Sequence, residues 1–483
     1  MMRRLAAVVV LMAAWNTRAG WAQSVSPEVQ RHIDKVTSCV HEAVMSEGEP
    51  CVGLEARMAQ YHVPGVSIAV VHDGKIEWAR GFGVASVGGP AVTAETMFQA
   101  GSISKPVAAM AALKLVERKK LSLDVDVNSE LKEWKLPASE AAKGKTVTLR
   151  ELLTHTGGTT VHGFPGYAQG ETVATLVQVL NGEKPANTGA IRIEAEPGTK
   201  WNYSGGGYTI MQTMVVDVTG ETFPKTLHDL VLVPIGMTHS TYEQPRPGTM
   251  GPAAVPYNGD GTPVTGGAHT YPEMAAAGLW TTATDLGKYI IENQQSLQGK
   301  ANHVLSEAMT KEMMTPGMGG WGLGVQIGGK AGDQYFEHGG VNAGFEALVV
   351  GYENHGDGAV VMTNAQGGSR LADALMKSIA AEYGWPDFKT VVRSEVKVAP
   401  SVLAQYVGTY DLLPTFSLTF TMDGDAMYAQ SNPNDKMRVY AESETKMFLK
   451  ARDAEIEFVK DDKGQVTGLV LHQGSRDMKG VKK

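Results

Sequence analysis

The chain has 483 residues, of which 43% are hydrophobic and 19% are charged, and its formal net charge is −8. This composition is typical of a soluble globular protein with a large core, and the length suits one large and one small domain. The acidic balance argues against nucleic acid and anionic membrane surfaces as partners.

Residues 1–22 have the features of a secretory signal. Arg3 and Arg4 precede an apolar run, Leu5 to Trp15, that is too short to span a bilayer, and Gly20-Trp21-Ala22 supplies small residues for cleavage. We therefore expect a secreted or periplasmic protein, with an uncleaved N-terminal anchor as the alternative. Cleavage would remove three arginines and no acids, and would change the net charge to −11. No other stretch resembles a membrane span.

The only cysteines are Cys39 and Cys51. Export to an oxidising compartment favours a disulfide between them, and two buried free thiols are the alternative. The bridge would tie a predicted N-terminal helix, Pro27 to Met45, to the rest of the chain.

The next segments predict an antiparallel sheet interrupted by a helical lobe. Val66 to Val71 and Lys75 to Arg80 flank Asp73-Gly74, a dipeptide typical of a tight hairpin turn. Signals are mostly helical from Lys105 to Gly278. Further strands, and then an amphipathic helix, are predicted at Gly322 to Ile327, Gln334 to Glu337, Phe345 to Tyr352, Ala359 to Thr363 and Leu371 to Tyr383. We expect an α+β fold in which helices flank the sheet, with a pocket where the sheet meets the lobe.

Residues 399–483 follow a different pattern. Phe416 to Thr421 alternates strictly between apolar and polar residues, as a half-buried strand does, and Asp423-Gly424 and Lys463-Gly464 are turn signals. The expected organisation is a signal over residues 1–22, a large domain over 23–386, and a small all-β domain over 399–483.

One Ser-x-x-Lys stretch stands in an unusual context. Gly101-Ser102-Ile103-Ser104-Lys105 precedes a run, Val107 to Leu113, that is apolar nearly all round and predicts a buried helix. The serine would lie beside unpaired N–H groups at the helix start, and the lysine one turn away would be a base for it. Three other matches, at Ser129/Lys132, Ser394/Lys397 and Ser443/Lys446, lie in charged segments.

Two later segments carry candidate partners. Tyr203 lies in a glycine-rich turn before a predicted helix, from which a phenol can project into a cleft, although an ordinary turn aromatic is the alternative. Glu337-His338-Gly339-Gly340-Val341 lies between strand signals, where glycines would let a substrate approach and backbone N–H groups hold an oxyanion. An exposed histidine at a strand end is the alternative for His338.

The sequence contains none of the motifs that would indicate an α/β-hydrolase, a zinc site or a phosphate-binding site. The chain has no Gly-x-Ser-x-Gly, no His-Glu-x-x-His, no zinc-spaced cysteine pairs and no phosphate-binding loop. We therefore expect neither a metal nor a cofactor.

The order and spacing of Ser102 to Lys105, Tyr203-Ser204 and His338 to Gly340 resemble the three motifs of the serine β-lactamase and penicillin-binding protein superfamily. The tyrosine version, together with Leu152 to Gly158, resembles the branch of class C β-lactamases, D-alanyl-D-alanine carboxypeptidases and family VIII esterases. The resemblance covers about residues 55–385 and implies a β-lactamase/transpeptidase-like fold. The C-terminal domain resembles small lipocalin-like appendages of some relatives.

The resemblance implies roles for individual residues. Ser102 would be the acylated nucleophile, Lys105 would help to deprotonate it, and Tyr203 would be a base or a proton shuttle. The oxyanion would rest on the N–H groups of Ser102 and Val341. His338, with Gly339 and Gly340, would orient Tyr203 or bind a substrate carboxylate.

Two departures from the family pattern bear on the substrate. Gly205 stands where the lactamases have asparagine, and His338 stands where efficient lactamases have lysine. A neutral histidine binds a carboxylate less firmly than an ammonium does.

We expect an exported serine hydrolase of β-lactamase or penicillin-binding type that forms an acyl-enzyme from small β-lactam, ester or D-amino-acid amide substrates. The alternatives are a family VIII-type carboxylesterase with little lactamase activity and a non-catalytic protein that senses penicillin or peptidoglycan fragments. The sequence leaves the oligomeric state open.

Overall fold

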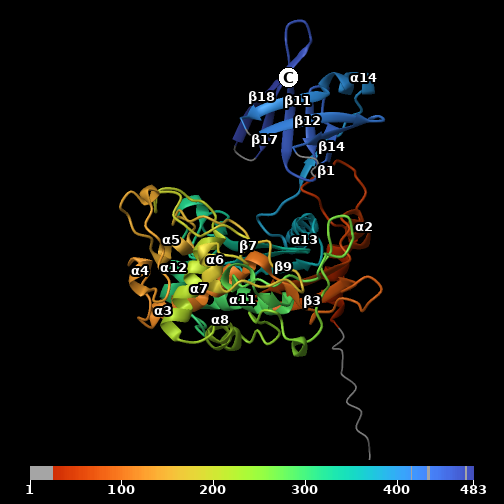
Figure 1. Ribbon diagram of the computed structural model, residues 1–483. Helices are drawn as coiled ribbons and strands as arrows, with labels where there is room; N and C mark the ends of the chain where they lie inside the picture. The colour runs from red at the N-terminus through yellow and green to blue at the C-terminus, as the bar shows by residue number, and fades with distance from the viewer. Residues whose placement is uncertain (1–24, 415, 432–435, 474–475) are drawn as a thin grey trace, which may run out of the picture.

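A six-stranded antiparallel sheet organises the N-terminal three quarters of the chain (Figure 1). The computed structural model describes residues 25–414, 416–431, 436–473 and 476–483. The predicted signal, residues 1–22, lies outside them. In spatial order the strands are β3 (Lys75–Gly83), β2 (Gly65–His72), β9 (Gly358–Thr363), β8 (Phe345–Tyr352), β7 (Tyr335–Asn342) and β6 (Gln326–Gly328). Segments from both ends of this region therefore form one sheet, as predicted.

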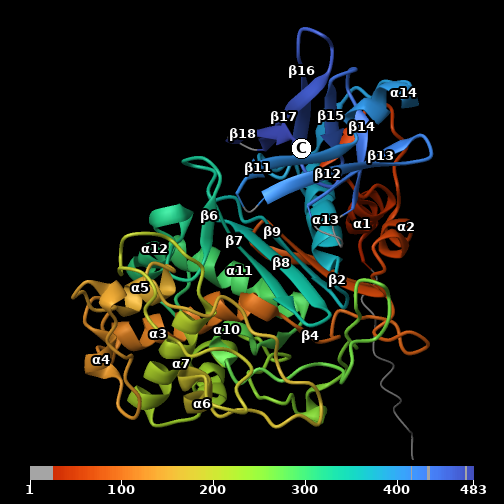
Figure 2. The same cartoon turned by 45° about the horizontal axis from the view of Figure 1, so that its top comes forward.

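Successive residues of a strand point to opposite faces of the sheet, and here the residues on both faces are apolar. Helices therefore cover both faces. On one face α1 (Pro27–Ser38) packs on α13 (Gly368–Tyr383), and α13 packs on β8 and β9. On the other face α11 (Ala283–Leu297) packs on β2, β8 and β9. Figure 2 shows the sheet between α13 and the lobe.

The helical lobe lies between the two-residue strands β4 (Phe98–Gln99) and β5 (Trp280–Thr281). Its main helices are α3 (Ser104–Glu117), α4 (Val127–Glu130), α5 (Leu149–Leu153), α6 (Leu176–Asn181), α7 (Gly205–Thr219), α8 (Phe223–Leu227) and α10 (Met274–Ala277). Long irregular segments connect them, so the lobe is less helical than the sequence pattern predicts.

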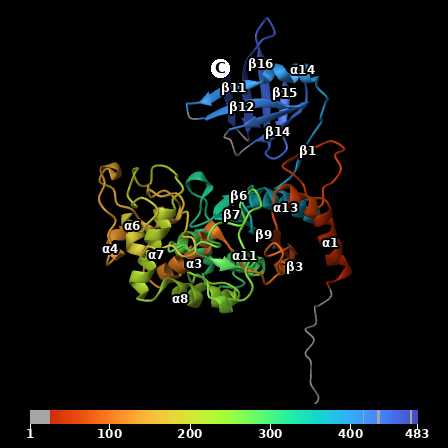
Figure 3. The ribbon, with the colours of Figure 1, turned by 45° about the vertical axis from the view of Figure 1, so that its right-hand side comes forward.

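The C-terminal region is a closed eight-stranded antiparallel barrel. Its strands are β11 (Gly408–Leu413), β12 (Phe416–Asp423), β13 (Ala426–Gln430), β14 (Met437–Ala441), β15 (Lys446–Leu449), β16 (Ala454–Lys460), β17 (Val466–Gln473) and β18 (Arg476–Lys482). Buried aromatic side chains such as Tyr410, Phe420 and Phe458 pack inside it. Figure 3 shows the barrel standing apart from the lobe.

The predicted bounds of one helix and two strands were wrong. The N-terminal helix ends at Ser38 rather than Met45, because Cys39 is extended and joins Cys51 in a disulfide. The segment after it instead forms β1 (Val44–Ser46), which pairs with β10 (Val391–Arg393) beneath the barrel. The strand predicted to end at Glu337 continues to Asn342, and only the end of the stretch from Gly322 to Ile327 lies in β6.

Ion pairs link the N-terminal segment and the linker to the barrel. Lys450 Nζ lies 2.7 Å from Glu49 and 3.3 Å from Glu395, and Arg393 contacts Glu442 and Glu455 at 3.2 and 2.7 Å. No helix of the described residues is long and apolar enough to cross a membrane.

Candidate active site

Ser102 lies in the 3₁₀ turn η1 (Gly101–Ile103), which leads directly into the buried helix α3. This turn meets β7 backbone to backbone. A Cβ atom on Gly101 would lie 2.5 Å from the Val341 nitrogen, and one on Gly340 would lie 2.0 Å from the Ala100 oxygen, so only glycine fits at either position. The contact sets the backbone at Ser102 beside that of Val341. Pro106 lies within the first turn of α3, where its missing N–H is tolerated.

Lys105 is buried next to Ser102. The residue is only 2% exposed. Its Nζ lies 3.0 Å from Ser102 Oγ and donates to the carbonyl of Ala276 in α10 at 2.8 Å. No ion pair to a carboxylate is found for Lys105 within the described residues. Burial lowers the pKa of Lys105 to about 7. A large fraction of this amine is therefore neutral near pH 7 and can accept a proton.

Tyr203 comes from the loop before α7 and reaches the same point. Lys105 Nζ lies 4.9 Å from the centre of its ring. Burial raises the pKa of Tyr203, and the contact between its phenol and the Ser102 hydroxyl opposes that rise only in part. The phenol therefore keeps its proton at neutral pH.

His155 forms hydrogen bonds with the residues immediately before and after Tyr203 in the sequence. Its carbonyl accepts from the N–H of Asn202 at 2.8 Å, and its Nδ1 accepts from the N–H of Ser204 at 3.1 Å. The rings of His155 and Tyr203 have centres 4.2 Å apart. His155 itself has a left-handed backbone (φ 58) just after α5, which turns the chain toward this loop. This role of His155 was not predicted, because its segment, Leu152 to Gly158, contributed only to the family resemblance.

His338 lies in β7, at the outer edge that β6 leaves uncovered. β6 pairs with residues 335–337 only, so the edge of β7 from His338 onward lies beyond its end. His338 is buried, its Nδ1 lies 2.6 Å from the Gly339 carbonyl, and its Nε2 has no hydrogen-bond partner among the described residues. Burial, and secondarily the charge of Lys105, lower the pKa of His338 to about 3. The imidazole is therefore neutral.

The two glycines after His338 differ. Gly340 is the close contact with the turn of Ser102, whereas a Cβ atom on Gly339 would meet only the Ala347 oxygen, at 4.0 Å. Strand alternation places Gly339 and the side chain of Val341 on the opposite face from His338. At Gly339 and Val341 only the backbone is therefore available to the site.

An aromatic cluster surrounds Tyr203 and His338. The ring of Trp321 has its centre 5.3 Å from that of His338, 5.9 Å from that of Tyr203 and 4.9 Å from that of His155. Trp201 is stacked on Trp321 at 5.9 Å.

A further aromatic residue, Phe164, lies next to Gly205, which is one of the two positions that depart from the family pattern. A Cβ atom on Gly205 would lie 2.7 Å from the ring of Phe164. Phe164 therefore occupies the space into which a side chain at this position would extend.

The structure thus brings together the predicted residues Ser102, Lys105, Tyr203 and His338, from the lobe and the sheet. The turn η1 packs against β7, and α3 packs against α7; Figure 2 shows α3 and α7 in the lobe and β7 in the sheet. Within the described residues, no group of three or more histidine, cysteine or acidic side chains is arranged to hold a metal ion.

Comparisons of the chain with protein families and with known proteins agree with this architecture. The family model described as Beta-lactamase matches residues 54–382, and a model described as a domain of unknown function (DUF3471) matches residues 392–482. Penicillin-binding protein 4 of Amycolatopsis lactamdurans is 25% identical over 382 residues, which cover 74% of this chain and 95% of that protein.

Solved structures share the fold. The octameric penicillin-binding protein homologue from Pyrococcus abyssi aligns with a TM-score of 0.61 and 23% identity, over 88% of this chain and 97% of that one. The D-alanine carboxypeptidase AmpC from Burkholderia cenocepacia aligns with a TM-score of 0.54 and 20% identity, over 73% of this chain and 99% of that one. Because the family model spans more than half of its residues, the chain belongs to the β-lactamase family.

Proposed function

We propose that the protein is a serine hydrolase that forms an acyl-enzyme at Ser102. The observation that carries the proposal is the buried pair of Lys105 Nζ and Ser102 Oγ, 3.0 Å apart, with no carboxylate paired to the lysine within the described residues. A lysine used for structure is normally exposed or paired with an acid, because an isolated buried ammonium is unstable.

In the proposed acylation, neutral Lys105 takes the hydroxyl proton of Ser102 while Oγ attacks the acyl carbonyl carbon. The oxyanion lies against the backbone N–H groups of Ser102 and Val341. The bond to the leaving group then breaks, and Tyr203 donates its proton to the departing atom. The proton on Lys105 returns to Tyr203, so the site is ready for the second half-reaction.

In the proposed deacylation, a water molecule attacks the ester carbonyl of acylated Ser102. Neutral Lys105 accepts a proton of that water, and Tyr203 donates its own proton to Oγ as the bond between Oγ and the acyl carbon breaks, which releases the carboxylic acid. The proton on Lys105 then returns to Tyr203. His338 remains neutral throughout and helps to fix the ring of Tyr203. Lys105, Tyr203 and His338 therefore act as one unit around the nucleophile.

Esters are the favoured substrates within this proposal. In the lactamases that the sequence resembles, an asparagine stands at the position of Gly205, and here the ring of Phe164 fills that space. His338 offers a neutral imidazole where a lysine would attract a carboxylate. Both changes weaken binding of an acylamido carboxylate such as penicillin, and neither touches the acyl-transfer groups.

Export is part of the proposal. The apolar N-terminal segment predicts a signal peptide, and the Cys39–Cys51 disulfide suits an oxidising compartment. We also propose that residues 23–386 form the hydrolase domain and that residues 399–483 form a separate domain.

Turnover of p-nitrophenyl butyrate and nitrocefin by the purified protein tests the proposal. We expect hydrolysis of the ester to exceed that of the lactam, and Ser102→Ala to lower ester turnover by about 10⁴-fold or more. Ser443→Ala, at the barrel match of the same motif, is the control and should leave it unchanged. Retained turnover in Ser102→Ala would contradict the mechanism. A stable penicillin adduct on Ser102 without turnover of either substrate would instead favour a penicillin-sensing protein.

A further inference from the structure

Trp201 is an aromatic side chain that the proposed mechanism leaves without a role. The residue is 38% exposed, although the loop that carries it also carries Tyr203. Its ring centre lies 6.5 Å from that of Tyr203. Tryptophan is highly buried on average, and it is enriched at interfaces, where its apolar ring meets a partner.

The indole of Trp201 is held in place before any ligand binds. On one side it stacks on the buried Trp321, with an angle of 17° between the rings. On another side Gly319 approaches so closely that a Cβ atom there would lie 3.0 Å from Trp201 Cγ. Gly319 has a left-handed backbone (φ 69), so glycine is favoured there for two reasons. The exposed part of the indole is therefore a fixed apolar surface.

The mechanism indicates which part of a substrate lies against this surface. Tyr203 donates its proton to the leaving group, so the leaving group must lie next to the phenol. Four aromatic rings surround Tyr203, namely those of His155, Trp201, Trp321 and His338. His155, Trp321 and His338 are buried, so Trp201 is the ring of this group that can contact a leaving group from solvent.

We infer that Trp201, backed by Trp321, binds an uncharged aromatic leaving group, so that the preferred substrates are esters of aromatic alcohols. This inference rests on the proposed function and adds the substrate class to it. The imidazoles beside the indole carry no fixed charge with which to hold an anionic leaving group. In the reaction the acyl–oxygen bond breaks, the alcohol oxygen takes the Tyr203 proton, and the aromatic alcohol leaves across the indole.

Three acetate esters with alkyl leaving groups of similar reactivity test the inference, namely benzyl acetate, ethyl acetate and the anionic carboxymethyl acetate. For the wild-type protein we expect kcat/KM for benzyl acetate to exceed that for ethyl acetate by about tenfold, and the anionic ester to be the poorest. Trp201→Ala should abolish the benzyl preference with little change for ethyl acetate. Trp201→Phe should keep most of it, and the barrel surface variant Val481→Ala all of it.

Labelling of Ser102 by a small phosphonate verifies that Trp201→Ala leaves the acylation machinery intact. If labelling slows, Trp201→Leu, which keeps apolar bulk without a ring, takes its place in the comparison. A benzyl preference that survives both substitutions, a wild-type protein without the preference, or a preference for the anionic ester would overturn the inference while the proposed function stands. Absence of ester turnover, or turnover retained in Ser102→Ala, would overturn both.

Discussion

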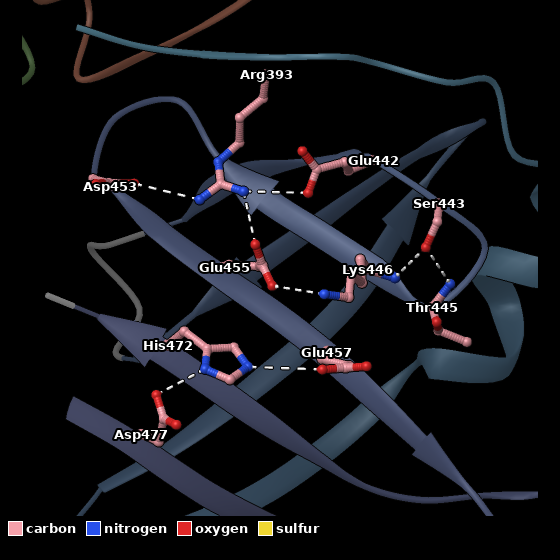
Figure 4. Close-up of polar contacts among 10 residues, drawn as sticks. All are labelled: Arg393, Glu442, Ser443, Thr445, Lys446, Asp453, Glu455, Glu457, His472 and Asp477. Atoms are coloured by element: carbon pink, nitrogen blue, oxygen red, sulfur yellow. Dashed lines mark hydrogen bonds and ion pairs between the residues drawn. The ribbon is translucent and has the colours of Figure 1, made fainter. Parts of the chain in front are cut away.

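Two Ser-x-x-Lys segments with the same spacing adopt opposite arrangements in this protein. At Ser102 and Lys105 the lysine Nζ lies against the serine Oγ. At Ser443, which lies between β14 and β15 of the barrel, and Lys446, which begins β15, the lysine Nζ instead lies 3.4 Å from Glu455 (Figure 4). The Ser443 hydroxyl accepts from the backbone N–H groups of Thr445 and Lys446 at 3.3 and 3.0 Å.

Burial and the neighbouring acids account for the difference. The Lys446 side chain is 44% exposed and stands in a network in which Glu455 also contacts Arg393, as Figure 4 shows. Lys105 is enclosed by an apolar helix and a carbonyl, so its amine is shielded from solvent, and among the described residues no carboxylate pairs with it. The same spacing is therefore not enough to pair the two side chains, and the surroundings decide whether the amine can be a base.

The remaining two Ser-x-x-Lys segments, Ser129/Lys132 and Ser394/Lys397, resemble the barrel segment in their contacts. Ser129 donates to the Asp126 carbonyl at 2.6 Å, and the backbone N–H of Lys132 binds Asp217. Ser394 lies 3.0 Å from Glu47, and Lys397 is exposed. In each pair the serine hydroxyl binds a group other than the lysine three residues further on.

The largest effect should come from replacing the two lysines. Lys105→Met should lower kcat/KM for p-nitrophenyl butyrate by about a thousandfold, because the proton acceptor for Ser102 is lost. Lys446→Met should change it less than about twofold, since an exposed lysine in the barrel takes no part. Steady-state kinetics on the two variants measures both. Equal losses would show that the comparison between the segments is mistaken.

The same variants should differ in how stability depends on pH. Lys105 has a pKa of about 7 in the folded protein against an ordinary value of 10.5, so between these pH values the unfolded chain binds more protons. Wild-type stability therefore gains a contribution as the pH rises from 7 to 10, on the order of 3–4 kcal/mol from this group.

Lys105→Met lacks this contribution, so its free energy of unfolding relative to wild type should fall as the pH rises over that range. Lys446→Met should run parallel to wild type. Urea unfolding at pH 7 and pH 10 measures the difference. A Lys105→Met curve parallel to wild type would mean that the lysine is charged in the folded state.

A smaller effect is expected at His155. His155→Asn keeps a residue that tolerates the left-handed backbone but removes the ring that packs on Tyr203. We expect kcat to fall roughly tenfold to a hundredfold through misplacement of Tyr203, with KM little changed. A rise in KM at constant kcat would instead assign His155 to substrate binding.

Much of the sheet could be predicted because its strands have local signatures. Phe345 to Tyr352 was predicted with the bounds that the structure shows, and Asp73-Gly74 forms the predicted hairpin turn between β2 and β3. The start of α5 has a local signature too, the capping box formed by Thr148 and Glu151. These features depend on residues close together in the sequence.

The parts that could not be predicted depend on distant contacts. Nothing local indicates that Phe164 fills the space beside Gly205, or that Gly319 supports Trp201. The role of His155 depends on a loop 47 to 49 residues further along the chain, to which two hydrogen bonds connect it. β7 continues past Glu337 because β8 pairs with it as far as Asn342, although its glycines are weak strand formers.

The central claim is that surroundings, not spacing, make Ser102 the nucleophile. Reaction of the full chain with a fluorophosphonate, followed by peptide mass spectrometry, tests it directly, with Ser102→Ala and Ser443→Ala treated in parallel. We predict a single adduct, on the peptide that contains Ser102, which is absent in Ser102→Ala and unchanged in Ser443→Ala. An adduct at Ser443 or another serine, or labelling that persists in Ser102→Ala, would contradict the account.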